Sequence, residues 1–158
     1  MTADANTRQI TNAYLKIFPG GIKEKNKMNM STLTLAGTML EYGVPSMNGF
    51  VIPKECELTI PEKIPVAWNY RFNTPGQVIG TAEVTVLKDR IEVTVKSAND
   101  MFNDFMRAEK KILCGGFWHH VKGHRKENGI LKVESARLGG LGVYLDGDKN
   151  LYLEIKEE

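Results

Sequence analysis

Two neighbouring stretches rich in β-branched residues constrain the fold of this 158-residue chain more than any other feature. Residues 77–87 and 90–96 alternate apolar with polar side chains, which is the period expected of a strand with one buried face. Lys88-Asp89 lies between them and has the length of a two-residue hairpin loop, although it lacks the glycine that such loops favour. The chain is therefore expected to form a β-rich domain.

Further strand candidates occupy much of the remaining sequence. Glycine, proline and asparagine residues separate them, and Asn128-Gly129 marks a tight turn between 119–126 and 130–137. Residues 139–142 (Gly-Gly-Leu-Gly) are interpreted as a flexible link. The other strand candidates are 32–38, 50–52, 55–60, 64–68, 113–121 and 151–155.

A single main helix is expected between these strands. Ser97 or Asn99 can cap its N-terminus, and Asp100 suits its first turn. Apolar residues at helical spacing continue to Leu113, so the helix is predicted over 97–113. The predicted fold class is mainly β (α+β), an antiparallel β domain or barrel crossed by one main helix. The apolar residues of the helix are Met101, Phe102, Phe105, Met106, Ala108, Ile112 and Leu113.

The first 29 residues are predicted to form an N-terminal arm, and residues 30–158 the β domain. Pro19-Gly20-Gly21 and the charged stretch 23–27 separate the few apolar residues of the arm from the first clear strand. An arm of this kind is either disordered or ordered by a partner.

Composition narrows the range of functions. The formal net charge is only +2, so binding to nucleic acid is not expected. No apolar run reaches the roughly 18 residues of a membrane span, and the polar N-terminus lacks the apolar core of a secretory signal. Two cysteines make no disulfide framework, which favours a reducing cytoplasm. The sequence shows no nucleotide-binding or metalloprotease motif, and neither a cofactor nor a metal is expected.

Two segments together have a layout that hydrolases use. A short apolar strand at 65–70 ends in a polar dipeptide, and a later strand at 113–118 carries a small residue beside glycines. A histidine would be wanted where Tyr70 stands, and a serine where Cys114 stands. A phenol with a reference pKa of about 10 is a poor general base at neutral pH. A thiol with a pKa of about 8.5 needs a nearby base or cation before it can attack.

Three histidines, at 119, 120 and 124, are the nearest bases in the sequence. On a strand, a residue five positions beyond Cys114 lies about 16 Å away and faces the opposite side, whereas His120 shares the face of Cys114 but lies farther still. The candidate catalytic residues are therefore Cys114, Tyr70 and His120. In the alternative interpretation, Cys114 is an inert core thiol and Tyr70 is a half-exposed packing residue.

The order of these elements resembles the capsid maturation (prohead) proteases of tailed bacteriophages, which are related to the herpesvirus assemblins. In that family a strand ending in Asn-His precedes an Ile-Gly pair, a hairpin, a helix and a Ser-x-Gly-Phe strand. The corresponding residues here are Asn69-Tyr70, Ile79-Gly80 and 114–117 (Cys-Gly-Gly-Phe). The resemblance covers residues 31–150, and three further stretches within it match the family: 33–37, 48–53 and 129–150. The last of these ends in Asp-Lys-Asn, where the family has Pro-Ala-Asn.

The resemblance implies a serine–histidine protease in which Tyr70 holds the histidine position and Cys114 the serine position. Because this pair is degenerate, we expect a structural protein of the phage virion or of capsid assembly, located in the virion or the host cytoplasm, that is not proteolytic. The alternative is an active capsid maturation endopeptidase with Cys114 as its nucleophile. A small β-rich binding module of cellular origin is a third hypothesis.

The basic stretch 122–126 is the expected contact surface. Lys122, His124, Arg125 and Lys126 place positive charge at a turn, where side chains are exposed. The expected partners are capsid or scaffold chains, and a homo-oligomer is a further candidate. A metal site and a solvated hairpin without a partner are the other interpretations of this stretch.

Overall fold

The computed structural model of the protein describes residues 32–46, 49–146 and 150–157. The predicted arm, residues 1–29, lies outside these described residues. In chain order the elements are β1 (Leu33–Glu41), β2 (Phe50–Val51), β3 (Glu57–Thr59), β4 (Lys63–Trp68), β5 (Val78–Val86), β6 (Arg90–Ser97), α3 (Asp100–Glu109), β7 (Lys111–Arg125), β8 (Leu131–Tyr144) and β9 (Tyr152–Glu157).

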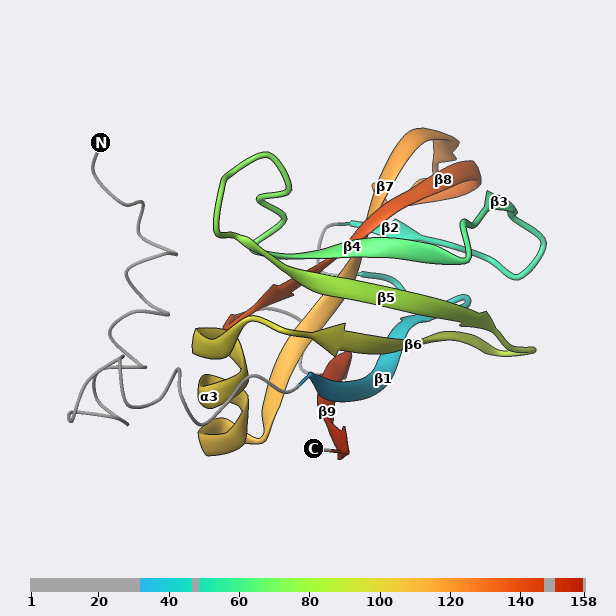
Figure 1. The fold of residues 1–158 in the computed structure, drawn as a ribbon. Helices are drawn as coiled ribbons and strands as arrows, with labels where there is room; N and C mark the ends of the chain where they lie inside the picture. Colours follow the sequence, from blue (N-terminus) through green and yellow to red (C-terminus); the bar gives the residue numbers. More distant parts are fainter. Residues whose placement is uncertain (1–31, 47–48, 147–149, 158) are drawn as a thin grey trace.

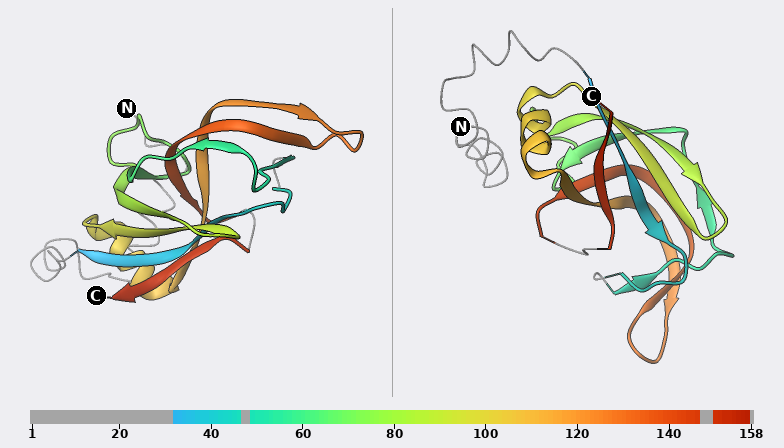
Figure 2. Two further views of the ribbon diagram at one scale, coloured as in Figure 1. Left: turned by 90° about the vertical axis from the view of Figure 1, so that its right-hand side faces the viewer. Right: turned by 90° about the horizontal axis from the view of Figure 1, so that it is seen from below.

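Seven of the strands close into a barrel (Figures 1 and 2). The hydrogen-bonded path runs from β8 through β4, β5, β6, β1 and β9 to β7, and β7 pairs with β8 again. Neighbouring strands are antiparallel except where β2, β3 and β4 meet β8 in parallel. This confirms the prediction of a mainly β, mostly antiparallel barrel with one helix.

The β5–β6 hairpin forms where the alternating sequence predicts it. Ile91, Val93 and Val95 point into the core while the residues between them are partly exposed. The N–H of Leu87 donates to the carbonyl of Arg90 at 2.8 Å, which closes the loop around Lys88-Asp89. Because side chains on a strand alternate between faces, this hairpin contributes one wall of the barrel core.

Helix α3 lies across one end of the barrel, at the left of Figure 1. The Asn99 side chain accepts a hydrogen bond from the N–H of Phe102 at 2.9 Å, as expected of an N-cap. Phe102, Phe105 and Met106 are buried against the strands, and the Phe105 ring meets Trp68 edge-on with ring centroids 6.3 Å apart. No helix in the described part of the chain is long and apolar enough to cross a membrane.

The predicted extent of this helix, 97–113, is wrong at both ends. The helix stops before Lys110, whose φ of 74° is left-handed and whose N–H donates to the Met106 carbonyl at 2.7 Å. Such a residue ends a helix because the chain turns away from the helical path there. Ile112 and Leu113 then belong to β7, in which Ile112 and Cys114 are buried at strand spacing. The apolar character of Ile112 and Leu113 fits the period of a helix as well as that of a strand. The helix C-cap at Lys110 determines that they belong to the strand.

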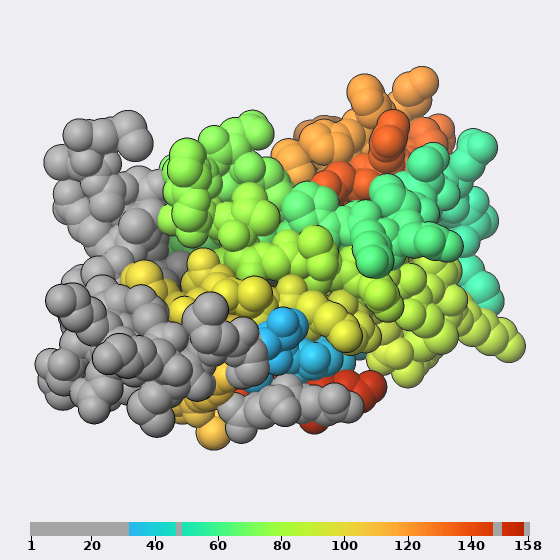
Figure 3. Space-filling view, viewed as in Figure 1, coloured from blue at the N-terminus to red at the C-terminus, as the bar shows by residue number. Residues whose placement is uncertain are grey.

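Strands β7 and β8 are the longest, with 15 and 14 residues, and continue beyond the barrel as a hairpin. Figure 2 shows this hairpin extending away from the body, and in Figure 3 its orange atoms stand out at the upper edge. Gly129, with a φ of 83°, lies in the turn that the sequence places there. Residues 139–142, interpreted above as a flexible link, instead lie inside β8, where Leu141 is fully buried.

Candidate functional site

Tyr70 is held in an unfavourable backbone conformation directly after β4. Asn69 and Tyr70 have φ values of 48° and 62°, in the left-handed region that non-glycine residues rarely adopt. The Asn69 N–H donates to the Val143 carbonyl at 2.8 Å, and the Arg71 N–H donates to the Trp68 carbonyl at 3.1 Å. These bonds turn the chain back over the barrel wall, so Tyr70 lies across β7 and β8 rather than in solvent.

The Tyr70 ring rests on two glycines that face each other across the β7–β8 ladder. Gly115 pairs with Gly142. A Cβ added at Gly142 would collide with the Tyr70 ring, and a Cβ at Gly115 would lie 2.6 Å from the Tyr70 hydroxyl oxygen. The two glycines are therefore required because an aromatic ring occupies the space of their missing side chains.

The same arrangement explains why residues 139–142 are not a link. The Phe72 ring fills the side-chain space of Gly140, and the His119 ring fills that of Gly139. Aromatic contacts join these rings into one layer outside the barrel: Phe72 stacks on Phe117 with centroids 5.2 Å apart, and Tyr70 stacks on Tyr144 at 5.8 Å. We refer to this set as the aromatic layer, consisting of Tyr70, Phe72, Phe117, His119 and Tyr144.

Cys114 lies on the opposite side of β7 from the aromatic layer. Its side chain is fully buried in the barrel core, and its thiol donates a weak hydrogen bond to the Thr38 carbonyl with an S···O distance of 3.6 Å. Burial raises the pKa of the Cys114 thiol to about 12. The thiol therefore stays protonated at neutral pH, and a protonated thiol is a poor nucleophile.

The structure thus brings Tyr70 to β7, but its hydroxyl lies next to Gly115. It does not meet the thiol of Cys114, the preceding residue, which faces the core. Burial raises the pKa of the Tyr70 phenol above its usual range, with smaller contributions from Tyr144 and Cys114. A phenol that holds its proton this firmly does not act as a general base at neutral pH.

The structure does not bring the third candidate, His120, to Cys114. The two residues are six positions apart on β7, which corresponds to about 20 Å at the rise of a strand. His120 is exposed and has a φ of 51°, at a point where the β7–β8 register shifts. His119 meets the edge of Phe117 with ring centroids 4.6 Å apart, and His124 contacts Glu134 at 2.7 Å. In the described ranges, no three His, Cys, Asp or Glu side chains are grouped as a metal site would need.

The four basic residues of the predicted contact surface all lie on the exposed end of the β7–β8 hairpin. The Arg125 guanidinium donates to the Gly129 carbonyl at 3.0 Å and so braces the turn. His124 is engaged with Glu134. The pKa of the Glu55 carboxyl is lowered mainly by a backbone hydrogen bond, then by Lys132, with a further contribution from Lys126. Lys122 has no carboxylate within 4.0 Å among the described residues.

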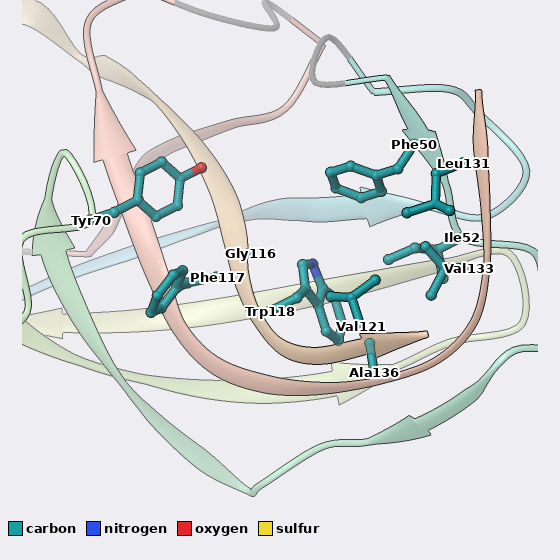
Figure 4. Close-up of a pocket in the computed structure, with 10 residues that line it drawn as sticks. All are labelled: Phe50, Ile52, Tyr70, Gly116, Phe117, Trp118, Val121, Leu131, Val133 and Ala136. Carbon is teal, nitrogen blue, oxygen red and sulfur yellow. The ribbon is translucent and has the colours of Figure 1, made fainter. Parts of the chain in front are cut away.

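A pocket of about 480 Å³ opens beside the aromatic layer, and the sequence did not predict it. Figure 4 shows its lining side chains around an open centre, with the Tyr70 hydroxyl and the Trp118 indole nitrogen turned toward that centre. Apart from these two groups the walls are apolar. The lining residues are Phe50, Ile52, Tyr70, Gly116, Phe117, Trp118, Val121, Leu131, Val133 and Ala136.

The pocket could not be located from the sequence because its walls come from four separate segments, at 50–52, 70, 116–121 and 131–136. The available signal was the apolar residues at 118, 121, 131 and 133, which interrupt an otherwise charged hairpin. Comparison of the chain with family models, curated proteins and solved structures finds no match.

Proposed function

We propose that this chain is a non-proteolytic protein of a phage virion or of its assembly, built on a barrel of the kind that the prohead-protease resemblance implies. The resemblance of residues 31–150 motivates the virion or assembly role, and the observation that carries the absence of proteolysis is the burial of Cys114. A nucleophile has to reach a substrate carbonyl, and this thiol is fully buried in the barrel core.

Two further observations support the absence of proteolysis. A cysteine nucleophile needs a base or cation that lowers its pKa, whereas burial raises the pKa of Cys114. The residue of β7 that lies next to the Tyr70 hydroxyl is Gly115, and a glycine has no side chain that could react. Neither the thiol nor the phenol is therefore prepared for acyl transfer.

The structure retains surfaces that suit binding. The β7–β8 hairpin stands out from the barrel and carries exposed positive charge, and the apolar pocket lies at its base. These surfaces are suited to contacts with capsid or scaffold chains, in which a projecting element of one protein fits against its neighbour.

Co-assembly tests this function. The chain would be expressed with the capsid and scaffold proteins encoded beside it, and particles would be purified by sedimentation. We expect the chain to sediment with the particles, and we expect Cys114→Ser to leave both its incorporation and the masses of the capsid proteins unchanged. A charge reversal, Arg125→Glu with Lys126→Glu, should reduce incorporation while the domain stays folded.

Two results would refute the proposal. Shortening of a capsid protein that requires an intact Cys114 would establish the endopeptidase instead. A folded chain that never sediments with particles, at low or high salt, would favour a binding module with a different role.

A further inference from the structure

We propose that the apolar pocket is the docking site for one segment of a partner chain, in which a bulky apolar side chain is flanked by acidic residues. The inference rests on the proposed function and adds to it the chemistry of the partner.

The size and walls of the pocket fit an inserted side chain. Its volume of about 480 Å³ lies within the roughly 300–1,000 Å³ of sites that enclose a ligand. Phe50 and Ile52 form one wall, and Trp118 with Val121 forms another (Figure 4). An aromatic or branched aliphatic side chain gains from leaving water for such walls, and interfaces commonly use one as an anchor.

Two strained backbone positions shape this pocket. Tyr70, at a φ of 62°, presents its hydroxyl to the opening, and His120, at 51°, stands directly before the pocket residue Val121. Conformations of this kind are unfavourable for non-glycine residues and persist only where the surroundings hold them. Val121 is nevertheless 43% exposed, so an apolar side chain at the mouth of the pocket remains in contact with water.

Charge identifies the kind of segment that would fill the pocket. The hairpin, residues 119–137, carries five lysine and arginine residues against two glutamates, and one of the five, Lys132, is paired with Glu55 at 3.5 Å, so a positive excess of two remains. Arg125 lies opposite Leu131 in the β7–β8 ladder, and cross-strand partners share a face, so this guanidinium leaves the sheet on the side of a pocket residue. A segment with carboxylates on either side of its apolar anchor would be complementary to this rim.

The positive charge of the hairpin also disfavours the chain's own N-terminal segment as the occupant. Residues 1–31 also carry five lysine and arginine residues against two acidic ones, so they would add positive charge beside the hairpin. One hydrogen-bond donor in the pocket, the Trp118 indole N–H, likewise suits a partner that supplies carbonyl or carboxylate oxygens, whereas the Tyr70 hydroxyl is engaged with Tyr144.

Peptide binding to the purified chain tests the inference. The probe is the capped heptapeptide Asp-Glu-Leu-Phe-Leu-Asp-Glu, and its matched control is Lys-Arg-Leu-Phe-Leu-Lys-Arg. Of the two tryptophans, Trp68 is fully buried in the core, so a change in fluorescence on titration reports mainly on Trp118. We expect the acidic peptide to bind at least about tenfold more tightly at low salt, and we expect this difference to shrink as salt screens the charges.

A pair of matched valine variants places the binding in the pocket. Val121→Asp puts a carboxylate at the pocket mouth and should weaken binding of the acidic probe at least about tenfold. Val86→Asp makes the same change at a valine that is 54% exposed on β5 and not part of the pocket, so it should leave binding unchanged. Both sites are exposed, and circular dichroism would verify that both variants fold.

Several outcomes would overturn the assignment. These are equal binding of the two peptides, no binding of either, or equal effects of the two valine variants. Stronger binding by a peptide of residues 7–18 would assign the pocket to the chain's own arm, and a dimer that Val121→Asp dissociates would assign it to a second copy. A chain that sediments with particles but ignores the acidic probe refutes only this inference, whereas one that binds the probe but never joins particles refutes only the proposed function.

Discussion

The ring of Tyr70 occupies the space that a side chain at Gly142 would need. Gly142→Ala should therefore displace the ring and destabilise the fold by about 1–3 kcal/mol, the usual cost of overpacking. Urea denaturation of the single variants and of the double variant with Tyr70→Ala measures the coupling. In the Tyr70→Ala background the alanine should cost distinctly less, because the ring is gone. Strictly additive losses would show that the ring and the glycine do not interact.

Alkylation should separate the two cysteines. Cys56 is partly exposed and Cys114 is buried, so iodoacetamide at pH 8 should modify one thiol of the native protein, identified by mass spectrometry as Cys56. Cys114 should react at least ~1,000-fold more slowly than free cysteine, because its exposure requires opening of the core. In Cys56→Ser the native protein should stay unmodified until denaturant is added. Rapid labelling of Cys114 in that variant would contradict its burial.

Stability should fall in alkaline solution from about pH 9. The thiol of Cys114 ionises near its ordinary pKa, about 8.5–9, in the unfolded chain but only near 12 in the folded one. Unfolding above pH 9 therefore releases a proton, and the free energy of unfolding decreases as pH rises, by at most ~1.4 kcal/mol per pH unit for one group. Below pH 9 the contribution of this thiol is fully present and constant.

Cys114→Ala supplies the control for this pH dependence. Cys56 is present in both proteins, so its titration cancels in the comparison. Urea midpoints between pH 8 and pH 10 should fall less steeply for the alanine variant than for the wild type. Parallel curves would mean that the thiol is not held protonated by the fold. Tyr70, whose pKa burial also raises, adds its own decrease above pH 10 in both proteins.

The N-cap of α3 should contribute measurably to stability. Asn99→Ala removes the acceptor for the Phe102 N–H and should lower the free energy of unfolding by about 1 kcal/mol. For a chain of this length that corresponds to a decrease in melting temperature of about 2–4 °C. Asn99→Asp retains an acceptor and should melt near the wild type. If the alanine variant were as stable as the aspartate variant, the Asn99 cap would not contribute to stability.

The strands were predictable where one face is buried and the other is not. The β5–β6 hairpin follows from its alternation, and the turn at Gly129 follows from the Asn-Gly pair, because both signals are local. The end of α3 was not predictable in this way. Ile112 and Leu113 suit a helix and a strand equally, and the left-handed conformation of Lys110 decides the boundary.

Residues 139–142 show why glycine-rich sequence is ambiguous. Glycines favour flexible segments, but they also occur where another group approaches the backbone closely. The groups that approach here are the rings of Tyr70, Phe72 and His119, which lie on other segments of the chain. Tyr70 meets β7 at Gly115, whereas the thiol of the preceding residue, Cys114, lies on the core side, and which face of β7 holds the thiol depends on the register of the closed barrel.

Strand β8 pairs with β2, β3, β4 and β7, so four separate segments depend on one strand. Val66 on β4 pairs with Leu141, which the ribosome adds about 75 residues later. Until Leu141 is synthesised, the edge of β4 that faces β8 has no partner. The order of synthesis thus delays closure, and contacts between such distant segments are typical of domains that fold in milliseconds to seconds. A nascent chain that ends before β8 exposes open strand edges, which are prone to pair with other chains until β8 is synthesised.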